Sequence, residues 1–193
     1  LETLAEGARV VGDLSAAATG ALVIGAPPAI STYLLPGLLR ELEATHPTIE
    51  LAVRGGHSDE ILEMVVRDEV QVALIRELAH PDVVTERVFE DELVLVCAPG
   101  HRLAQRRTVA IEQVADERLV LFDRASSFAD IALTLFQRAR LKPRALLEMD
   151  NTEAAAQMVI RGIGIALLPR TAIAVSLAEG DLVELHLLNT PQM

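Results

Sequence analysis

The chain is poor in cysteine: Cys97 is the single one among its 193 residues. One cysteine excludes a disulfide within the chain and favours a reducing compartment, so we expect a cytoplasmic protein. No apolar run approaches the roughly 20 residues that a membrane-spanning helix needs. Residues 1–6 are acidic and lack the basic and apolar regions of a signal peptide, and the chain does not begin with methionine. We therefore expect a fragment or processed chain without a membrane partner.

Positive charge is scarce, since 17 lysine and arginine residues face 28 aspartate and glutamate residues, for a formal net charge of −11. The deficit lies in the first half: residues 1–97 hold 6 arginines against 17 acidic residues, and the remainder is balanced. Direct binding of nucleic acid needs clustered lysine and arginine opposite phosphate, so the composition argues against it. The change of charge near residue 97 also suggests two lobes.

Sets of residues that carry catalysis are missing as well. Ser126 and Ser127 lack the strand–Gly-x-Ser-x-Gly–helix context of a nucleophile elbow. The five histidines include no pair at metal-ligand spacing, and one cysteine cannot build a thiolate site. Gly162 and Gly164 lack the third glycine of a dinucleotide fingerprint and precede a strand. We therefore predict a protein that is not an enzyme and that uses no cofactor and no metal.

What the sequence does contain is an alternation of short apolar runs and amphipathic segments, which is typical of an open α/β protein. Many of the runs end at Ser, Thr or Asn residues that can cap the next helix. We expect helices over residues 1–18, 31–45, 58–65, 111–115, 127–140, 151–161 and 170–177, and strands over residues 21–25, 49–54, 70–75, 83–89, 93–98, 119–122, 145–149, 165–168 and 182–187.

Two features of this pattern carry particular expectations. Gly162 follows a helix-like run and is predicted to end that helix in the left-handed conformation, before a buried strand that Pro169 stops. Cys97 ends the apolar run Leu93–Cys97. Plain core packing is the first interpretation of Cys97, and a redox or ligand-contact role is the alternative.

Several motifs resemble the effector-binding domain of LysR-type transcriptional regulators, in the family's order over about residues 20–190. The first is Gly20-Ala21-Leu22-Val23-Ile24-Gly25, followed by Leu34-Leu35-Pro36 and His46-Pro47. The second is Phe89-Glu90-Asp91-Glu92-Leu93-Val94-Leu95-Val96, followed by Gly100-His101-Arg102-Leu103-Ala104. The third is the glycine motif within Val159–Pro169.

The resemblance implies an α/β, two-lobed type-2 periplasmic-binding-protein-like fold with two crossover strands and an effector between the lobes. Residues 1–19 would be the end of a linker helix, 20–97 lobe I, 98–187 lobe II, and 188–193 a truncated crossover back to lobe I, whose return segment is missing. DNA would be bound only through the family's N-terminal winged helix-turn-helix domain, which is absent. Homodimers or homotetramers would place the helix near 34–42 against the partner's helix near 131–138.

The sequence departs from the family before its third strand. The family often carries a glycine and then an aspartate there, and this chain has Asp68 and Gln71. The geometry of that turn and the hydrogen bond made by the family's aspartate are therefore open.

Ligands of such a fold meet strand ends and helix N-termini, where free N–H groups favour anions. We hypothesise a small organic effector, with a carboxylate, held by hydroxyls from both lobes and by Arg76 as counter-charge. No cofactor is expected. The candidate effector-binding residues are Ser31, Thr32, Gly56, His57, Arg76, Ser126, Ser127, Phe128 and Thr152.

Each candidate also has a purely structural interpretation. A serine or threonine here can serve only as a helix cap, and Arg76 can form a surface ion pair with Glu77. Phe128 suits core packing as well as stacking on a ligand ring, and His57 suits a solvated loop. Two other functions stay open: a solute-binding protein of a transporter, and an enzyme on the same fold.

Overall fold

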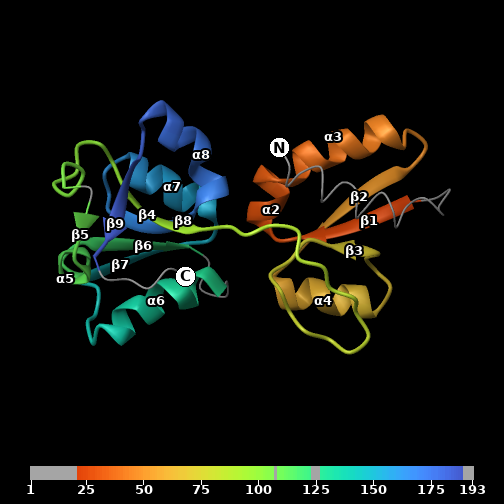
Figure 1. The fold of residues 1–193 in the computed structure, drawn as a ribbon, viewed down its shortest axis with the longest axis horizontal. Helices are drawn as coiled ribbons and strands as arrows, with labels where there is room; N and C mark the ends of the chain where they lie inside the picture. The colour runs from red at the N-terminus through yellow and green to blue at the C-terminus, as the bar shows by residue number, and fades with distance from the viewer. Residues whose placement is uncertain (1–20, 107, 123–126, 189–193) are drawn as a thin grey trace. The chain divides into compact units, whose positions relative to one another are not determined.

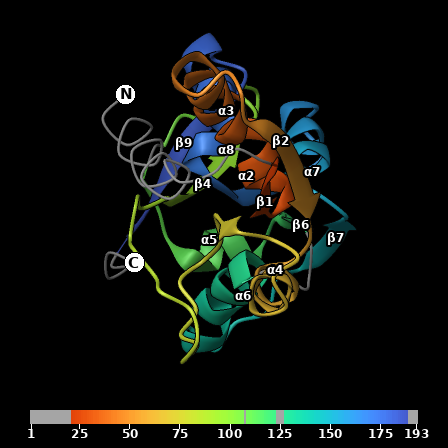
Figure 2. The same cartoon turned by 90° about the vertical axis from the view of Figure 1, so that its right-hand side faces the viewer.

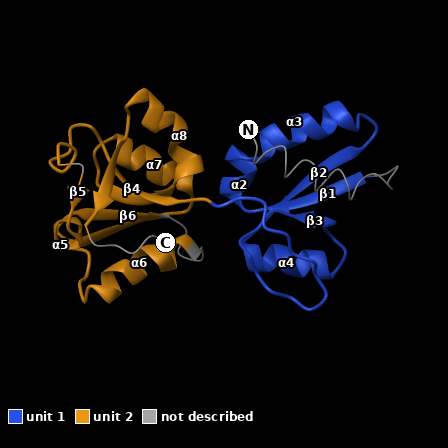
Figure 3. Cartoon of the chain, viewed as in Figure 1, with its two compact units in different colours: residues 1–90 blue, residues 91–193 orange. Residues whose placement is uncertain are grey.

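The computed structural model describes residues 21–106, 108–122 and 127–188. The chain separates into two compact units, which meet in sequence between Glu90 and Asp91 (Figures 1 and 3). The boundary expected from charge lay seven residues later, after Cys97. The strand that contains Cys97 pairs with strands of the second unit, which explains the earlier division.

Unit 1 is built on a parallel sheet. Strand β1 (Ala21–Ala26) lies between β2 (Glu50–Gly55) and β3 (Val72–Ala73). The apolar run of β1 suits a central strand that is covered on both faces, and Ile24 is fully buried. β3 is shorter than the expected strand over 70–75, although the N–H groups of Gln71 and Leu74 on either side of it also donate to carbonyl oxygens of β1.

Helices cover both faces of this sheet (Figure 2). α2 (Pro28–Tyr33) and α3 (Leu35–Thr45) lie on one side, and α4 (Ser58–Val66) lies on the other. A single helix over 31–45, begun by Ser31 or Thr32, was expected and is wrong. Pro28 begins α2 earlier, since proline is pre-organised for the first helical position, and the chain kinks at Leu34.

Unit 2 is built on a mixed sheet with the order β5-β9-β4-β8-β6-β7 among the described strands. β6 runs parallel to β7 and β8, and β4 runs antiparallel to β8 and β9. The strands are β4 (Leu93–Cys97), β5 (Thr108–Val109), β6 (Arg118–Phe122), β7 (Ala145–Met149), β8 (Ile165–Pro169) and β9 (Val183–Leu187).

Helices also cover both faces of the unit 2 sheet (Figure 1). α5 (Ile111–Ala115) and α6 (Ser127–Arg138) pack on one face, and α7 (Thr152–Ile160) and α8 (Arg170–Glu179) on the other. β4 shows why its sequence is continuously apolar. Leu95 and Cys97 belong to the first core, and Val94 and Val96 to the second.

One expected strand is absent from the described residues. Residues 83–89 form no strand, and Val84 is 98% exposed. The segment carries alternating apolar residues, but no neighbouring strand in the described chain pairs with it, and an unpaired strand leaves its backbone groups unsatisfied. The expected helix over 1–18 lies outside the described residues.

The glycine motif has the predicted geometry. Gly162 has φ +74° and follows α7, so it ends that helix in the left-handed region. Gly164 needs to be small for a different reason: a Cβ there would collide with the backbone carbonyl of Arg118 on β6. The motif therefore combines a helix stop with close packing between β8 and β6.

Candidate functional site

The candidate residues of unit 1 gather at one edge of its sheet. β1, β2 and β3 are parallel, so their carboxyl ends lie at the same edge. α2 starts after β1, α4 starts after β2, and Arg76 follows β3. The topology therefore brings Ser31, Gly56, His57 and Arg76 to that edge.

Ser31 and Thr32 lie inside α2 rather than at its N-cap. The Ser31 hydroxyl donates to the carbonyl oxygen of Ala26 at 3.2 Å, and the Thr32 hydroxyl donates to that of Pro28 at 2.8 Å. A hydroxyl has one proton, so both side chains offer lone pairs rather than protons to any third group. The expectation that these two residues cap the helix is wrong.

His57 is the N-cap residue of α4, and Ser58 begins the helix. The His57 backbone N–H donates to Oε2 of Glu60 at 2.8 Å, which satisfies a donor at the start of the helix. Gly56 lies against the same carboxylate, since a Cβ at Gly56 would be 3.2 Å from Oε2 of Glu60. The turn formed by Gly56 and His57 therefore already makes contacts that stabilise the start of α4.

Arg76 is exposed, and its side chain forms no ion pair within the part of the chain that the structure describes. Its backbone N–H donates to the Ser58 hydroxyl at 3.4 Å, which ties the end of the β3 segment to the start of α4. The alternative of an ion pair with Glu77 is thus not seen among the described residues. A free guanidinium at a strand edge is available to an anion.

The candidates of unit 2 are only partly described. Ser126 lies outside the described residues, and Ser127 begins α6 without a described side chain. Phe128 is half-buried and packs against the core formed with α7 and α8, which favours its structural interpretation.

α6 follows β6 and α7 follows β7. Because these two strands are parallel, both helices begin at the same edge of the unit 2 sheet. Asn151 caps it: Oδ1 accepts from the Ala154 N–H at 2.8 Å. Thr152 occupies the first helical position and is only 6% exposed. Among the described residues it is the one polar residue that is buried. Asn151 is therefore the cap of α7, and Thr152 is its first helical residue.

An ionic cluster at the start of α8 was not found by sequence reasoning. Arg170 pairs with Glu92 at 2.9 Å and binds Glu184 through both terminal nitrogens, at 2.7 and 3.1 Å. The hydrogen bonds that Arg170 donates, first to Glu184 and then to Glu92, raise the pKa of its guanidinium above the usual range. The partners are 78 and 14 residues away from Arg170, so no local pattern announces them.

Cys97 is fully buried in the core between the sheet and α5 and α6. Burial, helped by the negative charge of Glu117, raises the pKa of its thiol to about 11. A thiol that stays protonated is a poor nucleophile and a poor metal ligand. The core-packing interpretation of Cys97 is confirmed.

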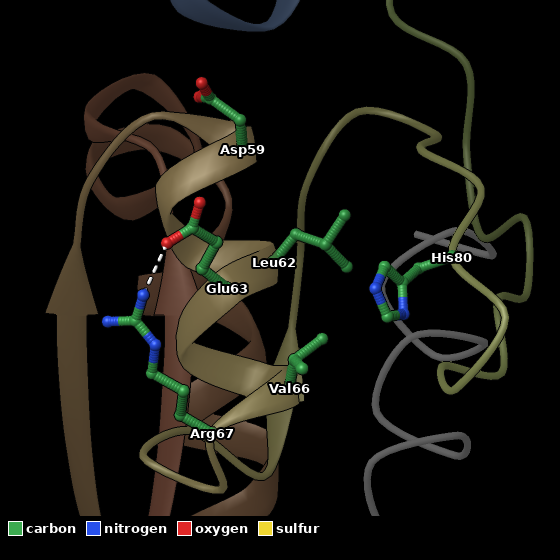
Figure 4. A pocket seen from close by; sticks show the side chains of 6 residues that line it. All are labelled: Asp59, Leu62, Glu63, Val66, Arg67 and His80. Carbon is green, nitrogen blue, oxygen red and sulfur yellow. Dashed lines mark hydrogen bonds and ion pairs between the residues drawn. The ribbon is translucent and has the colours of Figure 1, made fainter.

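A hollow of about 390 Å³ lies along α4 in unit 1, and none of the candidate residues lines it (Figure 4). Leu62 and Val66 of α4 point across it toward His80, and Glu63 and Arg67 on its rim pair at 2.8 Å. Among the described residues there is no helix long and apolar enough to cross a membrane, and no grouping of three His, Cys, Asp or Glu suited to a metal ion.

Comparison with known proteins identifies relatives of the whole described chain. Residues 15–193 match the family model described as LysR substrate binding domain. The HTH-type transcriptional regulator GltR of Bacillus subtilis is 30% identical over 181 residues, which cover 93% of this chain. Those residues are 60% of GltR, so the chain spans little more than half the length of such relatives.

Solved structures share the fold. The regulatory domain of Synechocystis CcmR in complex with 2-PG superposes with a TM-score of 0.78 at 23% identity, over 89% of this chain and 83% of that one. The effector binding domain of QuiR in complex with shikimate superposes with a TM-score of 0.74 at 20% identity, over 91% and 84%. The predicted two-lobed α/β fold is confirmed, and the alternative of a transporter's solute-binding protein is not favoured.

Proposed function

Because the chain belongs to the family of LysR substrate binding domains, we propose that it senses a small anionic effector for a longer transcriptional regulator. The observation that carries the proposal is the edge of the unit 1 sheet where α2 and α4 start, because Arg76 follows β3 at this edge and forms no ion pair among the described residues. Acidic residues outnumber basic ones in this chain, which has a net charge of −11. An arginine without an acidic partner at this edge therefore suggests that its partner is an anionic ligand. The QuiR domain, of the same fold, is described in complex with shikimate, a small carboxylate.

The hydroxyls narrow the class of effector. Ser31 and Thr32 already donate their protons to backbone carbonyls, so each accepts from a ligand in its present rotamer. We therefore propose an effector with a carboxylate for Arg76 and hydroxyl or amino donors for Ser31. We also propose that the effector contacts the remaining candidate residues, which are Gly56, His57, Ser126, Ser127, Phe128 and Thr152.

A thermal-shift screen tests the function. The panel contains simple carboxylates, hydroxycarboxylates, aromatic acids, amino acids and inorganic anions. A compound that binds only the folded state raises the melting temperature. At a ligand concentration one hundred times Kd, the free energy of unfolding increases by about 2.7 kcal/mol. We expect a saturable shift with a hydroxylated carboxylate that Arg76→Ala abolishes.

The matched control is Arg40→Ala, which removes one positive charge from an exposed position on α3 and leaves the strand edge intact. Arg40→Ala should keep the shift. If Arg76→Ala keeps the full shift as well, or if only cationic compounds produce one, the anionic effector is contradicted. Ser31→Ala should weaken binding of the hydroxylated compound more than that of its deoxy analogue.

The proposed regulator would act from the cytoplasm through a separate DNA-binding domain. The acidic balance of this chain disfavours contact with DNA, so the domain alone should not retard DNA in a gel at about 0.1 M salt. We further propose that domains pair, with α3 of one copy facing α6 of its partner. The buried positions of α3, Leu35, Leu38 and Leu42, serve its own core, so the pairing must use other residues.

A further inference from the structure

The turn between α6 and β7 is strongly basic in a chain that is otherwise acidic. No acidic residue occurs between Asp130 and Glu148. The basic side chains of this stretch are Arg138, Arg140, Lys142 and Arg144. All four are exposed, and none forms an ion pair among the described residues. Neighbouring cations repel one another, so such a cluster favours an anionic partner.

The backbone of this turn is held in place, so the cluster is a defined surface. Arg140 follows α6 with φ 56°, in the left-handed region where glycine is usual. The Leu141 N–H donates to the Phe136 carbonyl at 2.9 Å, and the Leu141 side chain packs against the unit 2 core. The Arg144 N–H donates to the carbonyl of Ala115, the last residue of α5, at 2.7 Å.

The corresponding turn of unit 1 is acidic. α3 leads to the outer strand β2 in unit 1, as α6 leads to the outer strand β7 in unit 2. Glu41 and Glu43 lie near the end of α3, and Glu50 begins β2. These carboxylates are exposed and have no ion pair in the part of the chain that the structure describes. Arg40 is the only arginine or lysine in residues 40–50, so the turn keeps a negative charge.

We propose that the basic α6–β7 turn binds the acidic α3–β2 turn of a second copy of the chain. The contact rests on the pairing proposed above, in which α3 faces α6 of the partner, and it sets the direction of the two helices. If they run in the same direction, the basic turn meets the acidic turn.

The opposite direction offers the charges no partner. The basic turn would then meet the start of α3, and residues 28–39 carry no charge. The acidic turn would meet the start of α6, where Asp130 has the same sign. Complementary charge at an interface fixes its register, so the helices run in the same direction.

The contact also selects the partner. Opposite charges attract the correct copy, and like charges reject a wrong one. A related domain with an acidic α6–β7 turn would therefore pair poorly with this chain.

Lys142 allows a direct test, because it is the only lysine of the chain. A carbodiimide joins a lysine amine to a carboxylate as an amide when the two are in contact, and mass spectrometry identifies the pair. In a mixture of isotope-labelled and unlabelled protein, we expect cross-links between copies from Lys142 to Glu41, Glu43 or Glu50. Lys142→Arg is the matched control: it keeps the charge, and should lose the cross-links while keeping the dimer.

Charge reversal gives the second readout, by analytical ultracentrifugation. The double variant Arg140→Glu, Lys142→Glu should self-associate at least about tenfold more weakly than the wild type, and so should Glu41→Lys, Glu43→Lys. Mixed together, the two variants should pair with each other, because opposite charges meet again. Raising the salt from about 0.1 M to about 1 M should weaken the wild-type pair, because the Debye length falls from about 10 Å to about 3 Å.

Arg161→Glu and Glu69→Lys are the matched controls. They reverse the charge of exposed residues elsewhere in the same two units and should keep the wild-type association. Arg140→Gly is the mildest variant, because glycine suits the left-handed backbone while one cation is lost. It should fold normally and pair more weakly.

The outcomes separate this contact from the pairing that it rests on. A dimer that persists in both charge-reversed variants, or cross-links of Lys142 to other carboxylates only, overturns the contact and leaves the pairing of α3 with α6 standing. A monomeric wild type overturns both, and the effector screen is unaffected. Equal weakening by Glu69→Lys, or binding to a DNA duplex that Arg140→Glu, Lys142→Glu removes without changing the dimer, also overturns the contact.

Discussion

At the residue scale, the glycine motif after α7 separates two reasons for glycine. Gly162 adopts a left-handed φ, and Gly164 lies against the Arg118 carbonyl. The first requirement is conformational and can be predicted from a helix followed by a glycine. The second depends on which strand lies beside β8, and this pairing between Leu119 and Ile165 crosses a long stretch of chain.

We predict that Gly164→Ala destabilises unit 2 by about 2–3 kcal/mol, because the new methyl group meets rigid backbone. Gly162→Ala should cost about 1 kcal/mol, the cost of a left-handed alanine. Gly100→Ala is the control, since a Cβ there meets nothing within 4 Å and φ is not left-handed. Urea denaturation gives the three values. Equal loss in Gly164→Ala and Gly100→Ala would refute the packing argument.

Cys97 leads to a prediction on pH. Its folded-state pKa of about 11 is above the ordinary value of 9.0. Well below pH 9 the thiol is protonated in both states, so it adds no pH dependence there. As the pH rises from 9 toward 11, the unfolded thiol ionises and the folded one does not, so stability falls by up to about 1.4 kcal/mol per pH unit.

Cys97→Val keeps a small apolar side chain in β4 and removes this titration. The melting temperature of the wild type should therefore fall more steeply than that of Cys97→Val between about pH 9 and pH 10.5. Parallel curves would mean that other groups cause the alkaline loss. The same burial predicts that a thiol reagent labels Cys97 only after unfolding.

At the scale of elements, the helices of unit 2 differ in where their N-terminal caps come from. α7 has its own cap in Asn151, and α8 takes its cap from Asp91. Asn151→Ala should destabilise unit 2 by about 1 kcal/mol, measured by chemical denaturation. Asn151→Asp keeps the acceptor oxygen and should be neutral or slightly stabilising. A loss in both variants would indicate that the amide nitrogen, not the cap, matters.

The helices and strands that the sequence predicted well are those with a local signal. α5, β7 and β4 lie where apolar runs and turn residues put them. The segment 83–89 failed because an alternating pattern shows that a strand is compatible with the sequence, not that a partner strand exists. Ser31 and Thr32 failed as caps because Pro28 began the helix a turn earlier.

The turn before β3 answers the question raised by Asp68 and Gln71. Asp68 takes φ 58°, in the left-handed region that a glycine would adopt more easily. The Gln71 side chain accepts from the Val23 N–H of β1 at 2.9 Å, and its backbone N–H donates to the Val23 carbonyl. The longer amide thus binds the β1 backbone, which no sequence pattern specified.

At the scale of the whole molecule, the uneven charge did indicate two units, but their boundary was not in the charge. β4 carries no charge that assigns it to a lobe; its assignment follows from pairing with β8, in which Leu93 lies opposite Pro169. Those residues are far apart in sequence, and antiparallel pairing over such a distance leaves no periodic signal. The positions of the candidate ligand residues in unit 1 could be predicted, because they follow the ends of parallel strands. The hydrogen bonds that Ser31 and Thr32 donate to backbone carbonyls could not be predicted.

The outer strands lead to the prediction on assembly. β2 and β7 end their sheets, and they expose Val53 at 38% and Leu146 at 41%. Natural outer strands usually carry charges or a cover that prevents pairing. Exposed apolar residues there, beside α3 and α6, favour burial against a second copy. We expect a dimer, with a mass about twice the 20.8 kDa of the chain by light scattering.

Val53→Glu places a charge on this surface and should shift the protein to monomer, because an unpaired carboxylate is costly to bury. Val84→Glu is the matched control in the same unit: Val84 is 98% exposed and lies on neither outer strand. It should leave the mass unchanged. If Val53→Glu stays dimeric and folded, the copies pair through another surface, and the proposed contact between α3 and the partner's α6 is lost with it.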